Sequence, residues 1–280
     1  MALIIAAVPI GNPEDASMRL IKAIESAEIV AAEDSRKFQR LCQDLNLQPK
    51  AKVISYFDGN ESERLSKLIE QLNSGIRILL VTDAGMPAIS DPGYLLVESA
   101  VQNGISVEVI PGPSAVTTAV AISGLPCEKF TFEGFLPRTE NAKRNELEKL
   151  RFEERTMVFF EAPHRIIETL EVLENILGKN RKACICRELT KTHEEIIRGD
   201  LSELVNWSKS KEMLGEFTLV IAGAEKDAEE ITNVEVVRMV QKYESAGMDR
   251  KEAISEVAKL TGLPKRNVFS AMVEAKSPLE

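Results

Sequence analysis

Short apolar runs alternate along the chain with segments whose apolar residues recur every three or four positions. The runs predict strands at residues 3–8, 29–32, 52–55, 78–82, 107–110, 130–135, 156–161, 183–187 and 216–222. The helical spacing predicts helices at residues 17–26, 38–45, 61–72, 93–103, 114–123, 142–152, 166–177 and 202–209. This alternation is typical of the α/β class, with mostly parallel or mixed sheets covered by helices.

The same pattern predicts three units along the chain. A second α/β unit begins after Pro111-Gly112-Pro113, which gives expected domains at residues 1–112 and 113–224. Residues 225–230 are acidic and are expected to form a linker. Three short helices at 234–245, 250–260 and 265–275 would then form a small module, residues 232–280, with a shape similar to a helix-turn-helix. A capping or dimer-contact appendage is the alternative, and the sequence leaves both open.

Two loops that follow buried strands are rich in glycine, proline and small polar residues. The first is Asp83–Gly93 and the second is Pro111–Ala115. In parallel α/β sheets, ligands bind beyond the carboxyl ends of the strands, and small residues let backbone groups approach them. Each loop alone fits a tight turn, but the two together predict a cleft for a small molecule.

Composition narrows the class of protein. The chain has 280 residues, 44% of them hydrophobic, without a run of about 18 apolar residues that would suit a membrane span. Residues 1–10 are expected to form a buried strand and not a signal peptide, so we expect a cytoplasmic protein.

The charge of the chain argues against a general nucleic-acid coater. The net charge is −9 and the pI about 5.1, whereas such proteins are usually basic. One local stretch, residues 178–191, carries five basic residues against a single acidic one. It is either a basic contact surface or an ordinary solvated loop, and the loop is slightly favoured.

The cysteine and histidine content predicts no metal site. Cys184 and Cys186 are expected on one face of a strand, while Cys42 and Cys127 stand alone. A CxxC pair is missing and only two histidines are present, so a structural zinc site is not expected. We expect the thiols to be buried as small apolar groups.

Eight motifs, in this order, carry a resemblance to a known family: Pro9–Asn12, Ala31–Arg36, Asp83–Gly93, Pro111–Ala115, Gly134–Arg138, Glu161–Arg165, Arg187–Lys191 and Gly215–Phe217. With them the chain resembles the tetrapyrrole-methylase-like superfamily of S-adenosylmethionine enzymes. Within it, the chain is most similar to the bacterial enzymes that methylate the ribose 2′-hydroxyl of a cytidine in 16S rRNA. The resemblance runs from Leu3 to about Gly223 and extends into the helical module.

The resemblance implies two α/β domains with S-adenosylmethionine in the cleft between them, no metal, and a homodimer. By position, the cofactor-binding residues would be Ile10, Gly11, Asp83, Gly85, Met86, Ile89, Ser114 and Ala115. Phe160 and Ala222 are looser candidates for the adenine side. Met86 stands where the rRNA branch usually has threonine, which puts a side-chain hydroxyl contact in doubt but not a backbone contact.

A ribose hydroxyl needs a general base before it attacks a methyl group. The candidate bases are Glu33 and Asp34, at a strand end facing the expected cleft, and Glu161. For the first two, a helix N-cap is an equally good interpretation. Six side chains would contact the partner, the 16S rRNA of the small ribosomal subunit: Arg36, Arg138, His164, Arg165, Arg187 and Lys191. For Arg138, solvated surface is the alternative.

Other functions stay open at this point. A precorrin-type methyltransferase shares the superfamily, although the basic stretch and the helical module argue against it. A non-catalytic ribosome- or nucleotide-binding module would use the same scaffold. A dinucleotide-dependent oxidoreductase is disfavoured because the first strand is not followed by GxGxxG.

Overall fold

The computed structural model describes residues 2–224 and 232–275, and its N-terminal half is built on a parallel sheet. The five strands are β1 (Ala2–Ala6), β2 (Ile29–Ala32), β3 (Lys52–Ser55), β4 (Ile78–Val81) and β5 (Ser106–Ile110). They lie in the order β3-β2-β4-β1-β5, and every pairing between them is parallel. The carboxyl ends of all five strands therefore meet at one edge, as the alternating pattern predicts.

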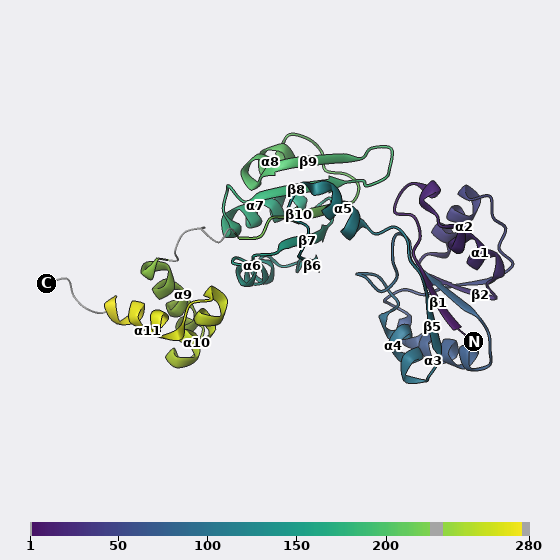
Figure 1. Cartoon of the computed structure of the whole chain (residues 1–280), viewed down its shortest axis with the longest axis horizontal. Helices are drawn as coiled ribbons and strands as arrows, with labels where there is room; N and C mark the ends of the chain where they lie inside the picture. The colour runs from purple at the N-terminus through teal and green to yellow at the C-terminus, as the bar shows by residue number, and fades with distance from the viewer. Residues whose placement is uncertain (1, 225–231, 276–280) are drawn as a thin grey trace.

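Helices cover both faces of this sheet (Figure 1). They are α1 (Met18–Ser26), α2 (Ser35–Asp44), α3 (Glu61–Asn73) and α4 (Tyr94–Gln102), with a 3-10 turn η1 (Pro13–Asp15) before α1. One apolar cluster contains Leu20 and Phe38 from α1 and α2, and a second contains Leu72 and Leu96 from α3 and α4. The three central strands, β1, β2 and β4, are buried between the two clusters, which explains their nearly continuous apolar sequences.

The C-terminal half is built on a second sheet of mixed direction. Its strands are β6 (Phe130–Phe135), β7 (Thr156–Glu161), β8 (Lys182–Arg187), β9 (Glu195–Asp200) and β10 (Phe217–Ile221). They lie in the order β6-β7-β10-β8-β9, and only β6 and β7 pair in parallel. Strands β1–β8 and β10 confirm the nine predicted strands, whereas β9 was not predicted. Its sequence, EIIRGD, holds only two apolar residues because it lies at the sheet edge.

Four helices flank the second sheet: α5 (Ala115–Ser123), α6 (Glu140–Lys149), α7 (Ile166–Leu177) and α8 (Leu201–Lys209). Cys184 and Cys186 pack with α5 on one face, as their spacing predicts. Ile185 packs with α7 and α8 on the other face. The prediction of buried thiols is wrong for Cys127, which is exposed in the connection after α5.

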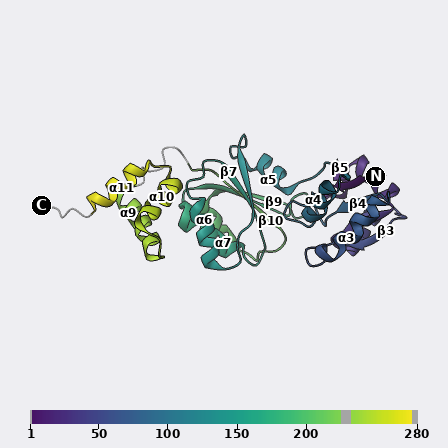
Figure 2. The ribbon, with the colours of Figure 1, turned by 90° about the horizontal axis from the view of Figure 1, so that it is seen from below.

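A tail module with its own core follows, formed by α9 (Asn233–Ser245), α10 (Arg250–Thr261) and α11 (Lys265–Glu274). It lies at the end of the molecule remote from the N-terminal half (Figures 1 and 2). Arg151, just after α6, forms an ion pair with Glu235 of α9 at 3.5 Å. The predicted acidic linker, residues 225–230, and residues 276–280 lie outside the described residues. None of the described helices is long and apolar enough to cross a membrane.

Candidate active site

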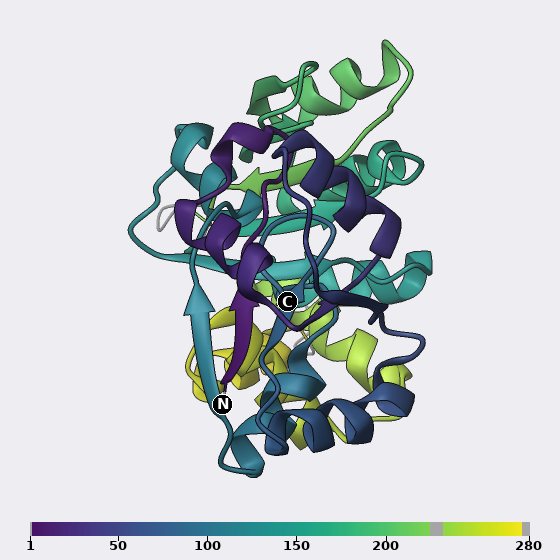
Figure 3. The same cartoon turned by 90° about the vertical axis from the view of Figure 1, so that its right-hand side faces the viewer.

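The two halves enclose a cleft of about 350 Å³, a size within the range of small-molecule sites. Seen end-on, the N-terminal half lies over the second sheet, as Figure 3 shows. Both walls contribute lining residues: Ile10, Ala84, Gly85, Met86, Ile89, Ser90, Asp91, Ser114, Ala115, Val116, Phe135, Phe160, Glu161, Ala162, Pro163, Gly215, Glu216, Phe217 and Thr218. The expected ligand cleft therefore lies beyond the carboxyl ends of the first sheet.

The N-terminal wall is a tightly bent loop after β4. Gly85 and Val8 exchange two backbone hydrogen bonds of 2.9 and 3.1 Å, with Gly85 at φ +76°. Ala88 and Ser90 also take positive φ values, +69° and +60°. Non-glycine residues in this region are strained, and such strain gathers at functional sites. The Gly93 amide closes the loop by donating to Glu61 Oε1 at 2.6 Å.

Asp91 is the titratable group of this loop that lines the cleft. Burial raises the pKa of the Asp91 carboxyl to about 7, and the nearby carboxylates Glu33, Asp83 and Glu216 raise this pKa further. The sequence motif contained Asp91, but its raised pKa could not be predicted, because the cleft that buries it and the carboxylates near it are formed by distant segments. A carboxyl that titrates near neutrality can exchange a proton with a substrate.

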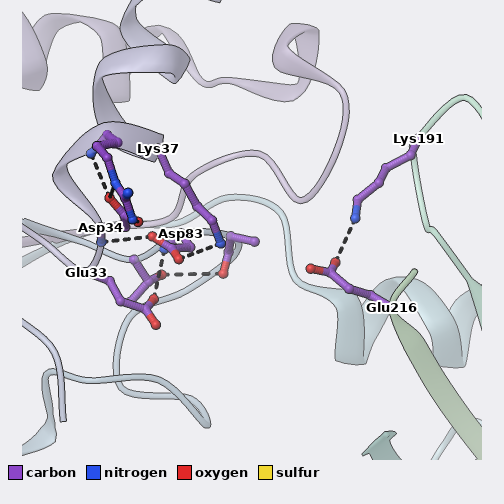
Figure 4. Close-up of polar contacts among 9 residues, drawn as sticks. Glu33, Asp34, Lys37, Asp83, Lys191 and Glu216 are labelled. Carbon is purple, nitrogen blue, oxygen red and sulfur yellow. Dashed lines mark hydrogen bonds and ion pairs between the residues drawn. The ribbon is translucent and has the colours of Figure 1, made fainter. Parts of the chain in front are cut away.

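Glu33 and Asp83 are bonded to each other and do not line the cleft (Figure 4). The Asp83 amide donates to Glu33 Oε2 at 3.1 Å, and the Asp34 amide donates to Asp83 Oδ1 at 3.0 Å. Lys37 Nζ donates to Asp83 Oδ2 at 2.8 Å. These bonds join the ends of β2 and β4, so the structure gives Asp83 a role in holding strand ends together.

Asp34 has the geometry of a helix N-cap. Its Oδ1 accepts the Arg36 amide at 2.8 Å at the start of α2. The Arg36 guanidinium, which is exposed, also bonds this carboxylate, and these bonds lower the pKa of Asp34 to about 2. Of the two interpretations left open by the sequence, the structure therefore favours the cap for Asp34. Burial raises the pKa of Glu33, but its carboxylate is directed to the Asp83 amide.

Glu161, at the end of β7, lines the opposite wall with a fully buried side chain. Its Oε1 accepts the Ala162 amide at 2.8 Å, and its Oε2 accepts the Thr169 hydroxyl at 2.6 Å. Lys143, which is also buried, donates to Thr169 Oγ1 at 3.1 Å and to Glu168 Oε1 at 2.8 Å. Both carboxylate oxygens of Glu161 are thus occupied, which fits a group that fixes the wall better than a base.

Arg165 points into the protein, in contrast to its expected contact with RNA. Its Nη2 donates to the carbonyl oxygens of Leu136 and Pro137 at 2.8 and 3.0 Å, and its Nε lies 3.3 Å from Glu161 Oε1. Its side chain is only 14% exposed. Arg165 therefore holds the loop that directly follows the lining residue Phe135, the last residue of β6.

A second contact joins the halves beside the cleft. Gly11 does not line the cleft; a Cβ at this position would lie 2.5 Å from Lys191 Cγ. The Asn12 amide donates to Thr190 Oγ1 at 3.0 Å. Lys191 Nζ in turn donates to Glu188 Oε1 at 2.8 Å and to Glu216 Oε2 at 2.9 Å, the second of which Figure 4 shows. These residues close one side of the cleft.

The basic stretch 178–191 is not a single solvated loop, because its residues 182–187 form β8. Arg187 donates to Glu195 Oε2 at 2.6 Å and to the Leu214 carbonyl at 2.7 Å. Arg187, Lys191 and Arg165 thus all form hydrogen bonds with other residues of the protein. Of the six predicted RNA contacts, Arg36, Arg138 and His164 are exposed.

Six of the eight predicted cofactor residues line the cleft together: Ile10, Gly85, Met86, Ile89, Ser114 and Ala115. Phe160 lines it as well, whereas Ala222 does not. Ser114 begins α5 without a side-chain cap, so the first amides of this helix are left for another acceptor at the cleft. Apolar walls, small residues and free amides fit an adenosine joined to an amino acid. Within the described ranges, no group of three or more His, Cys, Asp or Glu side chains is arranged to hold a metal ion.

A family model described as Tetrapyrrole (Corrin/Porphyrin) Methylases matches residues 2–205. The chain belongs to this family. It is accordingly an S-adenosylmethionine-dependent methyltransferase, and the cleft between its halves has the features expected for the cofactor.

Curated relatives cover nearly the whole chain. The relative from Mycobacterium tuberculosis (strain CDC 1551 / Oshkosh), named Ribosomal RNA small subunit methyltransferase I, is 46% identical over 98% of this chain and 95% of its own length. A relative of the same name from Halalkalibacterium halodurans is 44% identical over 96% and 93%. The Thermotoga maritima relative of this name, 44% identical, spans 80% of this chain and 99% of its own length, and is therefore shorter.

Solved structures share the fold. The methyltransferase CobJ matches with a TM-score of 0.60 and 16% identity, over 80% of this chain and 94% of that chain. The cobalt precorrin-4 methyltransferase CbiF matches with a TM-score of 0.58 and 18% identity, over 79% and 94%. At these identities the likeness shows the two-sheet architecture alone.

Proposed function

We propose that the protein methylates the ribose 2′-hydroxyl of a cytidine in the 16S rRNA of the small ribosomal subunit. The observation that carries the proposal is the 44–46% identity, over nearly the full chain, to relatives named Ribosomal RNA small subunit methyltransferase I. The cleft between the two halves supplies a site for the methyl donor. We also propose a cytoplasmic homodimer, as the resemblance implies.

The residues that line the cleft on both walls would hold the cofactor. S-adenosylmethionine supplies a methyl group on a positively charged sulfur. The backbone at Gly85 and Met86 would hold it from one wall and the first amides of α5 from the other. Phe135 and Phe160, whose ring centres lie 5.6 Å apart with the rings inclined at 59°, offer an apolar surface. Met86 has no hydroxyl, so its contact would be through the backbone and the thioether.

Asp91 is the proposed general base. It lines the cleft, and its pKa of about 7 lets it accept the hydroxyl proton near neutral pH. General-base assistance is worth about 10²–10⁴-fold in rate. Glu161, whose two carboxylate oxygens accept hydrogen bonds from the Ala162 amide and the Thr169 hydroxyl, is proposed to orient the turn that carries Ala162 and Pro163. Glu33 and Asp34 are proposed to keep the strand ends in place.

Arg36, Arg138 and His164 are proposed to meet RNA phosphates, since they are exposed. Arg165, Arg187 and Lys191 are proposed to position the loops from which such contacts are made.

Transfer of labelled methyl groups tests the proposal. Small subunits from a strain lacking the modification should accept one methyl group, which mass spectrometry should locate on the ribose of a cytidine. Transfer to a precorrin and not to subunits would replace the proposal by tetrapyrrole methylation. Tight cofactor binding without transfer to RNA would support a non-catalytic binding module.

A further inference from the structure

Helix α11 has one buried face and one exposed face. Its buried residues, Val268, Ala271 and Met272, pack into the core of the tail module. Asn267 and Glu274 are exposed near the edge of the helix, and five further exposed residues lie together on one side: Lys265, Arg266, Phe269, Ser270 and Val273. This side, which we call the α11 face, carries two cations and lacks a carboxylate.

The α11 face contains no acidic residue, although acidic residues are common in the module. Residues 232–275 contain seven basic and six acidic residues. The acidic residue of α11, Glu274, accepts a hydrogen bond from Asn233 Nδ2 of α9 at 2.8 Å. The α11 face is therefore positive in a chain whose net charge is −9. Such a surface complements a phosphate backbone.

Phe269 lies among these charges with 56% of its surface exposed. Cations beside an exposed ring are the combination with which proteins bind phosphates and stack unpaired bases. The turn between α10 and α11 contains Gly262 at φ +69°, and in helix-turn-helix pairs the second helix makes the contact with nucleic acid. RNA therefore fits the α11 face better than a second protein.

The position of the module tells which part of the RNA it could meet. The tail and the cleft lie at opposite ends of the C-terminal half (Figures 1 and 2). A nucleotide in the cleft is thus out of reach of α11 in the same molecule. In addition, the shorter relative from Thermotoga maritima matches 80% of this chain. The unmatched part is as long as residues 225–280, which include the tail module.

We propose that the α11 face binds RNA of the small ribosomal subunit at a distance from the nucleotide that is methylated. This inference rests on the proposed function. The contact adds affinity for a large substrate and leaves the chemistry in the cleft unchanged. Lys265 and Arg266 bind phosphates, and Phe269 stacks on an unpaired base.

Charge reversal tests this in the full-length protein. The double variant Lys265→Glu/Arg266→Glu should weaken co-sedimentation with small subunits and raise the KM for subunits about tenfold or more. It should also reduce the slope of log affinity against log salt by about one per residue. The cofactor affinity and kcat should stay unchanged. The matched control is Lys251→Glu/Lys259→Glu, which makes the same charge change at exposed positions of α10 in the same module.

Phe269→Ala should weaken subunit binding roughly tenfold without changing the salt slope, because stacking involves no phosphate. Equal behaviour of the α11 double variant and its α10 control would overturn the inference, as would a change in cofactor affinity. A change in oligomeric state confined to the α11 variants would identify the face as a protein interface instead. Wild-type protein that binds subunits through α11 but transfers no methyl group would overturn the proposed function alone.

Discussion

On the N-terminal wall of the cleft the backbone itself is bent into an unusual shape, at Gly85, Ala88 and Ser90. On the C-terminal wall Gly215 is the one lining residue with a positive φ, +90°, and Thr169 and the buried Lys143 form the hydrogen bonds that hold Glu161 in place. The first arrangement exposes backbone groups and one titratable carboxyl to a ligand. The second provides a firm apolar surface. We therefore propose that the two walls differ in their roles: the N-terminal wall supplies the general base, the C-terminal wall orients the ligand, and both offer backbone groups to the cofactor.

The largest effect should come from Asp91→Asn, which removes the titratable group of the N-terminal wall. We expect kcat to fall by about a hundredfold or more. For the wild type, kcat/KM should rise with pH and level off above about pH 7, because the carboxylate is the active form and its pKa is about 7. The variant should show no such step. Initial rates between pH 5.5 and 8.5 measure this, and a wild-type profile without the step would exclude Asp91 as the base.

Gly85→Ala should lower the affinity for S-adenosylmethionine about tenfold, because a methyl group would enter the cleft beside Ile10. Gly104→Ala is the matched control. Gly104 has a similar φ, +68°, but a Cβ there meets nothing within 4 Å. Both changes introduce backbone strain of about 1–2 kcal/mol. Calorimetric titration should separate them, and equal cofactor affinities would contradict the assigned role of the loop.

Thr169→Val tests the C-terminal wall by removing one hydroxyl with little change of shape. Lys143 and Glu161 would each lose a partner, so the free energy of unfolding should fall by about 1–3 kcal/mol. Cofactor affinity should fall several-fold because the turn after β7 loosens. Thr169→Ser keeps the hydroxyl and should restore cofactor affinity. If Thr169→Val binds the cofactor as the wild type does, the network serves stability only.

Asp34→Ala should have the smallest effect. The low pKa of Asp34, about 2, means that its contribution to stability is present above about pH 4 and is lost as the pH falls toward 2. The variant should therefore melt at a slightly lower temperature at pH 7 and match the wild type near pH 2. Its kcat should be unchanged. A large loss of kcat, measured at a temperature at which the variant and the wild type are both folded, would make Asp34 a candidate base again.

Most elements of the fold could be predicted because they contain short apolar runs or helically spaced apolar residues, whether the strand is central, as at 29–32, or at a sheet edge, as at 52–55. The strands at 29–32, 52–55, 130–135 and 156–161 and the helix at 166–177 have the predicted bounds. Strand β9 could not be predicted, because its sequence is mostly polar and the strand is stabilised by its hydrogen-bonded pairing with β8. The position of the cleft could be predicted from the loops Asp83–Gly93 and Pro111–Ala115, because the carboxyl ends of parallel strands lie at one edge of the sheet.

The roles of single charged residues could not be predicted in the same way. Arg165 meets the carbonyls of Leu136 and Pro137, which lie 29 and 28 residues away in sequence. Asp91 has a raised pKa partly because Glu216 lies near it in space. These partners are chosen by tertiary packing, so a basic residue near a motif can face inward as readily as toward RNA.

Because Gly11 has no side chain, the N-terminal half can lie close to Lys191 of the C-terminal half. Any substituent there would press on Lys191 and act as a wedge between the halves. Gly11→Ala should therefore force the two halves apart at this contact, because the added Cβ would also lie 2.8 Å from the Leu189 carbonyl oxygen.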